Sequence, residues 1–462
     1  MIVQSITLWR VTLPMKFDFQ TAKGLVRERH TLVVDVETAN GTRGYGEVVA
    51  FDTPFYTAET ITTSEEWLNQ VIPYFVGVKM KEPWDCYKVL EDLIPTAPHA
   101  APMAWAGLEN ALLHAYFEEE GLPMIRTLLE RELQARTAGG YKAGACKTDV
   151  REPGVREIAV GETSSCEVDI CEDFSLNDEI PIGLVFGDMP IPNLLQRIDD
   201  AVQKGCKRIK IKLTPRDAVE RLQAVREAYP DLILAADANR SFTIDNWPQV
   251  AQLDRFNLRT IEEPFSLIDD DLVKTYGALP HDFWKEWHTP ITFDESIQSL
   301  DALQAMERCR VAIETIQTTE TIQAAKIIHA SETIPVNEIL QATEAASRRF
   351  QPVLNIKIGR LGGLRETLRC LAYCQAHKWG FWIGSMVESG ISKILHVQLA
   401  ALPDVWMAGD LSDSKRYFEE DLISPDISFV DGRMKVPHGP GLGVTVRRDY
   451  LQTYGEILKE FV

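Results

Sequence analysis

The sequence predicts an α/β protein in which a modified TIM (β/α) barrel follows a smaller α+β unit. Two observations lead to this prediction. From about residue 181, short apolar runs alternate with segments of helical periodicity, which is typical of a parallel β/α fold. Before about residue 131 the pattern differs, with a strand–turn–strand pair followed by a long helical stretch. A chain of 462 residues is long enough for a barrel and a second domain.

The N-terminal unit, residues 1–131, begins with a strand pair. Residues 31–38 (TLVVDVET) are rich in valine and alternate in polarity, residues 39–41 form a turn, and residues 42–50 return as the partner strand. Residues 103–118 are helical in period. The apolar stripe of this predicted helix consists of Met103, Ala106, Leu108, Ala111, Leu112 and Ala115.

The barrel is predicted between residues 181 and 414. Its eight predicted strands are residues 182–186, 208–213, 232–237, 258–262, 291–294, 353–357, 380–383 and 405–408. Helices are expected between them, for example residues 215–229, where Thr214 and Asp217 give a capping signal. A doubly wound open sheet is the alternative. It would favour a glycine-rich loop after its first strand, and the sequence has none there.

Two stretches interrupt the barrel pattern. Residues 132–180, polar and rich in acidic residues, are interpreted as an insertion between the first unit and the barrel. Residues 311–350 are interpreted as a second insertion, helical in part, between the fifth and sixth predicted strands. Because insertions in loops cost little free energy, we expect the second one to loop out and leave the sixth strand in place.

The net charge is −20, from 68 acidic and 48 basic residues. An acidic surface argues against nucleic acid or an anionic membrane as a partner, but a locally positive site can still bind an anionic small molecule. The N-terminus is interpreted as a first strand and not as a signal peptide. No stretch is long and apolar enough for a membrane span.

The eight cysteines form no CxxC pair. Cys146, Cys166 and Cys171 lie close enough in sequence to suggest a zinc site, but their spacing is irregular and no histidine lies among them. Scattered free thiols are therefore favoured, which suits a reducing cytoplasm.

Charged residues end five consecutive predicted strands. They are Lys210 and Lys212 on the second, Asp237 on the third, Glu262 on the fourth, Asp294 on the fifth and Lys357 on the sixth. In a parallel barrel these strand ends share one mouth. Three converging carboxylates would repel one another unless a cation lies among them, and an all-oxygen ligand set suits Mg²⁺.

The lysines at this mouth could serve as acids and bases. Lys210 and Lys212 point to the same side of their strand, so both can face the site. Positive charge from Lys210 and the metal would lower the pKa of Lys212, and Lys357 would approach from the opposite side. Two such lysines can move protons on both faces of a carbon beside a substrate carboxylate, whose acidity the metal would increase.

Each of these motifs has a plainer interpretation when taken singly. Lys210 and Lys212 could cap a strand end in solvent, Glu262 could belong to a loop, and Asp294 could begin a helix. Their occurrence together, in strand order, favours the catalytic interpretation.

The sequence resembles the enolase superfamily, muconate-lactonising-enzyme subgroup, over most of the chain outside the two insertions. The matching motifs are IKIKL (209–213), DANRSFT (237–243), IEEPF (261–265), TFDES (292–296), NIKIGRLGG (355–363) and GSMVESGI (384–391). The stretches GYGEVVAFDTPFYTAET (44–60) and AGDLSDSKRYFEEDLI (408–423) match as well. One departure is Ile358, because the family pattern usually has proline directly after the sixth-strand lysine.

The resemblance implies a barrel whose N-terminal α+β unit is a capping domain, completed by residues 415–462 and carrying a mobile loop at residues 16–29. The implied acid/base pair is Lys212 and Lys357, with Lys210 tuning Lys212. The implied metal ligands are Asp237, Glu262 and Asp294, for Mg²⁺ or Mn²⁺ as a substitute. The residues expected near the metal shell or the substrate are Asn239, Ser385, Met386, Glu388 and Arg360.

Within the subgroup, the likeness is to o-succinylbenzoate synthases of the type that includes N-succinylamino acid racemases. It implies a small-molecule carboxylate substrate, a dehydration in menaquinone biosynthesis and a cytoplasmic enzyme, and it leaves a homo-oligomer open. Racemisation of N-succinylamino acids is the alternative at the same site, and Arg360 is one place where the balance between the two could be set. A dipeptide epimerase is less favoured, and a non-catalytic relative is the alternative from another class.

Overall fold

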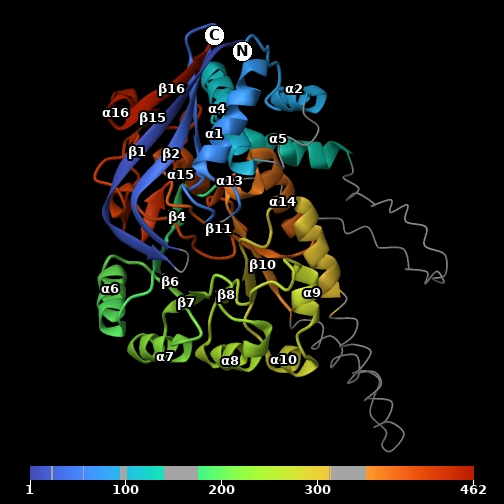
Figure 1. The fold of residues 1–462 in the computed structure, drawn as a ribbon, viewed down its shortest axis with the longest axis vertical. Coiled ribbons are helices and arrows are strands. Elements are labelled where there is room, and N and C mark those ends of the chain that lie inside the picture. The colour runs from blue at the N-terminus through green and yellow to red at the C-terminus, as the bar shows by residue number, and fades with distance from the viewer. Residues whose placement is uncertain (22–23, 56, 94–100, 140–174, 312, 314–349) are drawn as a thin grey trace, which may run out of the picture.

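The computed structural model describes residues 1–21, 24–55, 57–93, 101–139, 175–311, 313 and 350–462 (Figure 1). An antiparallel sheet with its helices lies at one end of the molecule, and a parallel sheet with its helices lies at the other (Figure 1). This arrangement confirms the predicted fold class.

Four strands form the antiparallel sheet, in the order β16-β1-β2-β3. Their bounds are β1 Val3–Thr21, β2 Gly24–Thr38, β3 Arg43–Val48 and β16 Gly455–Phe461. The predicted strand pair is confirmed, since β2 and β3 pair from Leu32 opposite Val48 to Glu37 opposite Arg43. Because β16 pairs with β1, the C-terminal end of the chain completes the N-terminal sheet, as expected.

The segment predicted as a mobile loop, residues 16–29, is mostly strand. Phe19 to Thr21 of β1 pair with Gly24 to Val26 of β2, and residues 22–23 lie outside the described part. The amide of Lys16 donates to the carbonyl of Tyr417 (2.8 Å). The prediction of a loop is wrong because these backbone groups find hydrogen-bond partners in extended segments. A role of this hairpin in covering a substrate stays a prediction.

Helix α4, Pro102–Glu120, confirms the predicted helix but not its single apolar stripe. All of residues 103–117 are buried. One side packs closely on β3, where a Cβ atom on Gly46 would lie 2.0 Å from the carbonyl oxygen of Gly107. Other residues of α4 contact α13 (Ile358–Leu361) and α14 (Leu364–Ala376) of the barrel. The helix is therefore enclosed between two layers and shows no exposed polar face over residues 103–117.

The barrel sheet has seven parallel strands in chain order. They are β5 Gly183–Phe186, β6 Arg208–Lys212, β7 Ile233–Asp237, β8 Thr260–Glu262, β9 Ile291–Phe293, β10 Pro352–Ile356 and β11 Gly380–Ile383. Seven of the eight predicted strands are thereby confirmed. The crossover helices include α6 Ile191–Gln203, α7 Ala218–Ala228, α8 Trp247–Ala251, α9 Leu272–Gly277, α10 His281–Glu286, α13 Ile358–Leu361, α14 Leu364–Ala376 and α15 Gly390–Leu399.

Residues 405–408 do not form a strand, so the prediction of an eighth strand is wrong. The amide of Trp406 donates to the carbonyl of Phe381 (2.8 Å), and the amide of Gly183 donates to the carbonyl of Gly409 (2.8 Å). These single hydrogen bonds join the segment to β11 on one side and to β5 on the other. The segment therefore closes the barrel without the repeated pairing that defines a strand.

Helix α7 begins three residues later than predicted. Its N-cap residue is Asp217, and the hydroxyl of Thr214 donates to the Asp217 side chain (3.3 Å) and not to the helix. The two predicted insertions lie largely outside the described residues, at 140–174 and 314–349. The start of the first insertion belongs to helix α5, Met124–Gly139.

Shorter elements complete the fold. They are α1 Ile61–Val71, α2 Asp85–Leu93, β4 Glu179–Pro181, β12 Ile423–Ser424, β13 Phe429–Val430, β14 Arg433–Lys435, β15 Thr445–Val446 and α16 Arg448–Tyr454. In the described part of the chain, every helix is too short or too polar to span a bilayer. The described cysteines are free and buried, namely Cys86, Cys206, Cys309, Cys370 and Cys374. Cys146, Cys166 and Cys171 lie outside the described residues.

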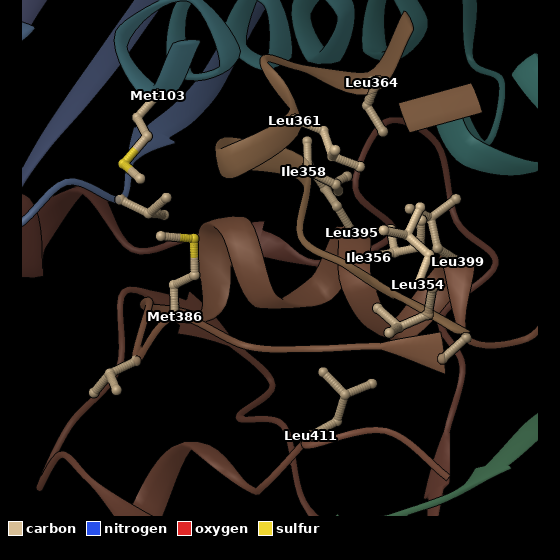
Figure 2. Packing of buried hydrophobic residues seen from close by; sticks show 14 of the residues in the cluster. Met103, Leu354, Ile356, Ile358, Leu361, Leu364, Met386, Leu395, Leu399 and Leu411 are labelled. Atoms are coloured by element: carbon tan, nitrogen blue, oxygen red, sulfur yellow. The ribbon is translucent and has the colours of Figure 1, made fainter. Parts of the chain in front are cut away.

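The apolar core continues from the N-terminal helices into the barrel. Figure 2 shows side chains of α4, α13, β10 and α15 packed together, among them Met103, Ile356, Ile358 and Leu395. All four are buried. The two halves therefore share one core, which fixes the backbone around the end of β10.

Candidate active site

The carboxyl ends of β6 to β10 bring together the residues that the sequence predicts. Lys212 ends β6, Asp237 ends β7 and Glu262 ends β8, while Asp294 and Lys357 directly follow β9 and β10. The strand order places the three carboxylates on neighbouring strands, with one lysine-bearing strand on each side. All three carboxylates are at most 1% exposed, so the site is built from buried charges.

Each of these carboxylates has a cationic partner. Lys212 Nζ lies 2.6 Å from Asp237 Oδ2, and Lys357 Nζ lies 2.5 Å from Asp294 Oδ2. Lys210 Nζ lies 2.6 Å from Glu262 Oε2. Burial of several charges in one place is tolerated only when they are paired in this way.

Lys210 has a further partner, Asp410, to which the sequence analysis assigned no role. Its Nζ lies 2.5 Å from Asp410 Oδ2 and 3.3 Å from Asp237 Oδ2. Burial alone would lower the pKa of Lys210, but Asp410, Glu262 and Asp237 raise it above its ordinary value. Lys210 is therefore a charged structural ammonium, and its effect on Lys212 stays a prediction.

The sequence held one signal for Asp410. It lies in the AGDLSDSK run, at the closing segment between β11 and β5. Asp410 also forms an ion pair with Arg208, whose side chain is 1% exposed. Because no strand ends at Asp410, the pattern of charged residues at strand ends does not include it.

The pKa values of the carboxyls differ along the row. Burial raises the pKa of Asp237, but Lys212 and Lys210 outweigh it and bring that pKa below its ordinary value. Burial raises the pKa of Glu262, and the neighbouring charge of Asp237 raises it further. The charge of Asp237 thus disfavours ionisation of Glu262, and a cation bound between the two carboxylates would favour it.

The donor set fits a hard divalent cation, because Asp237, Glu262 and Asp294 offer only oxygen atoms from adjacent strand ends. Nevertheless, the described residues contain no group of three histidine, cysteine or acidic side chains arranged to hold a metal. The ion pairs explain this, since lysine ammoniums lie against the carboxylates. Metal binding therefore requires these ammoniums to give up part of their contact.

Asn239 links the lysine to the carboxylates. Lys212 Nζ donates to Asn239 Oδ1 (2.6 Å), and the side-chain nitrogen of Asn239, Nδ2, donates to Glu295 Oε1 (3.0 Å). The backbone N–H of Asn239 donates to Asp237 Oδ1 (2.9 Å). Asn239 therefore fixes Lys212 and Asp237 relative to each other.

Glu263, to which the sequence analysis gave no catalytic role, positions the next carboxylate. Its side chain accepts hydrogen bonds from the backbone amides of Asp294 and Ser296, both at 2.8 Å, and it forms an ion pair with Arg240. Burial raises the pKa of Glu263 to about 7. In the sequence, Glu263 is the second glutamate of the IEEPF motif. In the structure, its backbone is in the left-handed region, at φ 42°.

Arg360 lies behind Asp294. Its guanidinium contacts Asp294 Oδ1, and its Nε donates to the carbonyl of Ile297 (3.0 Å). The side chain is fully buried. Arg360 therefore supports a metal-ligand candidate, and its role near the substrate stays a prediction.

Ser385, Met386 and Glu388 lie together in the loop after β11. Ser385 is partly exposed, whereas Met386 and Glu388 are fully buried. The Glu388 carboxylate accepts hydrogen bonds from Ser385 Oγ (3.2 Å) and from the backbone amide of Met386. Of these three predicted substrate-binding residues, only Ser385 presents its side chain partly to solvent.

The N-terminal domain is anchored at this loop through Arg29. The Arg29 guanidinium donates to the carbonyl oxygens of Val387 (3.1 Å), Val49 (2.7 Å) and Ala50 (2.7 Å). Its side chain is buried and lies over the ring of Phe51 at 4.2 Å. This contact joins β2 of the N-terminal sheet to the mouth of the barrel.

Comparison with known proteins identifies the family of the chain. A family model described as enolase C-terminal domain-like matches residues 193–331 and 334–450, more than half of the chain. The o-succinylbenzoate synthase of Bacillus subtilis is 30% identical over 453 residues, covering 98% of this chain and 96% of the relative. The N-succinylamino acid racemase of Thermus thermophilus is 28% identical over 454 residues, covering 98% and 97%.

Solved structures show the same architecture. A protein from Enterococcus faecalis, described as an unknown member of the enolase superfamily, has a TM-score of 0.70 at 26% identity and covers 100% of this chain and 99% of its own. The muconate lactonizing enzyme of Pseudomonas putida has a TM-score of 0.67 at 17% identity, covering 99% and 100%, and so supports the fold alone. With a matching family model, aligned relatives and the predicted strand-end residues at one mouth, the chain belongs to the enolase superfamily.

Proposed function

We propose that this enzyme is an o-succinylbenzoate synthase, which dehydrates 2-succinyl-6-hydroxy-2,4-cyclohexadiene-1-carboxylate in menaquinone biosynthesis. The observation that carries the proposal is the pair of lysines, Lys212 and Lys357, on the strands that flank three buried carboxylates. Relatives named o-succinylbenzoate synthase that align over nearly the whole chain support the choice of substrate.

Lys212 would act as the base. Its Nζ takes the proton from the carbon beside the substrate carboxylate, and in a syn elimination the leaving hydroxyl lies on the same face. The C–H electron pair forms the new ring double bond as the C–O bond breaks. The Lys212 ammonium gives its proton to the departing hydroxide, so the products are water and an aromatic ring. The Lys212 side chain is 17% exposed and that of Lys357 only 4%, which makes Lys212 the more accessible base.

Lys357 would remain protonated during the synthase reaction. It lies on the opposite flank of the carboxylate row, where its ammonium can stabilise the negative charge that develops as the proton leaves. Its ammonium pairs with Asp294 at 2.5 Å, a contact that would weaken in part when Asp294 binds the metal. Preorganised charge of this kind lowers the barrier without movement during the reaction.

Asp237, Glu262 and Asp294 would hold Mg²⁺, or Mn²⁺ in its place. Bound magnesium supplies Lewis-acid stabilisation for charge on the substrate carboxylate. Glu263 and Arg360 would keep Asp294 in position, and the buried setting would exclude water from the reacting groups.

The second candidate is racemisation of N-succinylamino acids. Syn elimination needs one base, whereas racemisation needs a base on each face of the α-carbon, and this site has a lysine on each flank. Relatives named N-succinylamino acid racemase, at 28% and 29% identity, support this candidate to a similar degree.

The test is to follow dehydration by ultraviolet absorbance with purified protein, in Mg²⁺ and after chelation, beside Lys212→Ala as the inactive control. We expect turnover that requires both the metal and Lys212. If folded protein dehydrates nothing but racemises N-succinylamino acids, the second candidate replaces the first. Absence of turnover in both assays would favour a non-catalytic relative.

A further inference from the structure

The backbone directly after Lys357 carries an amide that needs a partner. Ile358 is the first residue of α13, and the first amides of a helix have no acceptor within the helix. The N–H of Ile358 donates to Nε2 of His396 on α15, at 3.1 Å. Both residues are fully buried, so water does not offer an alternative acceptor. Figure 2 shows Ile358 of α13 close to Leu395, the neighbour of His396 on α15.

This hydrogen bond fixes the state of the imidazole. Because Nε2 accepts the Ile358 N–H, the ring proton must lie on Nδ1. Nδ1 lies 3.2 Å from Glu388 Oε1, so His396 donates to the Glu388 carboxylate. The other carboxylate oxygen is held by the Met386 amide and by Ser385. A carboxylate therefore orients a neutral histidine, which in turn holds one backbone amide.

The electrostatics of Glu388 agree with this arrangement. Burial would raise the pKa of the Glu388 carboxyl, whereas the hydrogen bonds from His396 and the Met386 amide and the nearby charge of Lys393 lower it. The carboxylate is thus ionised and accepts hydrogen bonds only. It is not exposed, so these internal partners account for its charge.

The sequence explains why the amide needs a partner in this chain. Proline, which is common in the first position of a helix, has no N–H there. With isoleucine at 358, an N–H enters a buried position next to the lysine. An unpaired buried amide destabilises the folded state, and the hydrogen bond to His396 removes that cost.

The loop after β11, which contains Glu388, packs on the side chain of Lys357. A Cβ atom on Gly384 would lie 2.9 Å from Cε of Lys357, so the loop after β11 lies against the Lys357 stem. Glu388 orders this loop, and His396 connects it to the Lys357 backbone. Both the backbone and the side chain of Lys357 are therefore held by one set of residues.

We propose that His396, oriented by Glu388, is a positioning residue that fixes the backbone after Lys357 by accepting the Ile358 amide. The importance of this role for turnover rests on the proposed function of Lys357. The structural part does not depend on it, because it concerns a single hydrogen bond between α13 and α15.

The experiment compares His396→Leu, which removes the acceptor, with His396→Gln, which offers a carbonyl oxygen at a similar reach. The first readout is deuterium exchange of the Ile358 amide, which does not depend on activity. We expect exchange to accelerate about tenfold or more in His396→Leu and to stay within about threefold of the unchanged protein in His396→Gln. Equal exchange in His396→Leu and the unchanged protein would overturn the proposal.

The second readout is proton exchange at the α-carbon of the two N-succinylamino acid enantiomers in D₂O. One enantiomer has its α-proton facing Lys357, and His396→Leu should slow exchange of that proton. The slowing should be at least about tenfold greater than for the other enantiomer, and it should arise mainly from a lower kcat. Equal slowing of both would indicate general damage and overturn the proposal. If the unchanged protein exchanges neither enantiomer, the racemase candidate fails, and the Ile358 amide alone decides the proposal.

A double-mutant cycle gives a test specific to this amide. Ile358→Pro removes the N–H, and Lys357 already has the extended backbone that a residue before proline requires (φ −138°, ψ 113°). In that background, His396→Leu still removes the hydrogen bond to Glu388 but no longer leaves the amide without an acceptor. Its effect on Lys357-side exchange or, if that activity is absent, on the unfolding equilibrium should therefore be at least about threefold smaller than with isoleucine at 358. Ile358→Val, which keeps the N–H, controls for lost packing and should leave the full effect. Equal effects of His396→Leu in both backgrounds would contradict the proposal.

Discussion

Lys357 and Asp294 form a buried ion pair in which Nζ and Oδ2 lie 2.5 Å apart. The same carboxylate contacts Arg360 through its other oxygen. Asp294 thus lies between two cations, although we propose it as a metal ligand. A third cation can bind only if Lys357 or Arg360 weakens its contact.

Asp294→Asn should therefore abolish stabilisation by Mg²⁺. For the unchanged protein, a metal concentration 100 times the dissociation constant stabilises the fold by about 2.7 kcal/mol. Asn cannot supply the negative charge, so the melting temperature of the variant should not rise with Mg²⁺. The control is Asp254→Asn, at a carboxylate that accepts from Thr289 away from the site. An equal rise of melting temperature in Asp294→Asn and the unchanged protein would remove Asp294 from the ligand set.

Single lysine replacements should separate the two faces of the substrate. Lys212→Ala should lower dehydration by about 10²–10⁴-fold, because the base is lost. In racemisation, Lys212→Ala and Lys357→Ala should each still exchange the α-proton of one enantiomer in D₂O, through the lysine that remains. Proton exchange followed by NMR measures both faces in one sample. Loss of exchange with both enantiomers in either single variant would contradict a two-sided site.

Arg360→Met should lower both activities together. The guanidinium is fully buried and contacts Asp294, and it also donates to the carbonyl of Ile297, so its removal disturbs a metal-ligand candidate. We expect weaker Mg²⁺ affinity and equal proportional losses in dehydration and racemisation. Titration with Mg²⁺ and both assays on one preparation measure this. A change in the ratio of the two activities at saturating Mg²⁺ would instead support a role in specificity.

The five residues at the strand ends could be predicted because a parallel sheet brings consecutive strand ends to one edge. Position along the chain was sufficient for Lys212, Asp237, Glu262, Asp294 and Lys357 to be placed together. It was not sufficient for Asp410, which follows a segment that closes the barrel without strand pairing.

His396 could not be predicted either. It lies within α15, where a histidine in an apolar helix is usually interpreted as part of the core. Its role depends on a contact with Ile358, which is 38 residues away, and on the absence of proline there. The burial of α4 on all sides has a similar origin, since its second buried face results from contact with the barrel. Long-range contacts of this kind leave no local periodicity in the sequence.

His114 on α4 should make the protein sensitive to acid. Its Nδ1 accepts the backbone N–H of Tyr45 (2.9 Å), and burial lowers its pKa to about 4. In the unfolded chain the histidine binds a proton near its ordinary pKa of about 6.5, whereas the folded state does not. Stability from this residue is therefore complete above about pH 6.5 and is lost as the pH falls toward 4, by about 3 kcal/mol in total.

His114→Asn tests this, because an asparagine oxygen can accept the Tyr45 amide and does not titrate. Urea unfolding at several pH values should show a smaller loss of stability between pH 6.5 and 4 in the variant than in the unchanged protein. Above pH 7, where the histidine is neutral in both states, the two curves should run parallel, which separates titration from any loss of packing. If the two curves were parallel in acid as well, burial of a neutral His114 would not be the cause of acid sensitivity, and other buried groups would have to account for it.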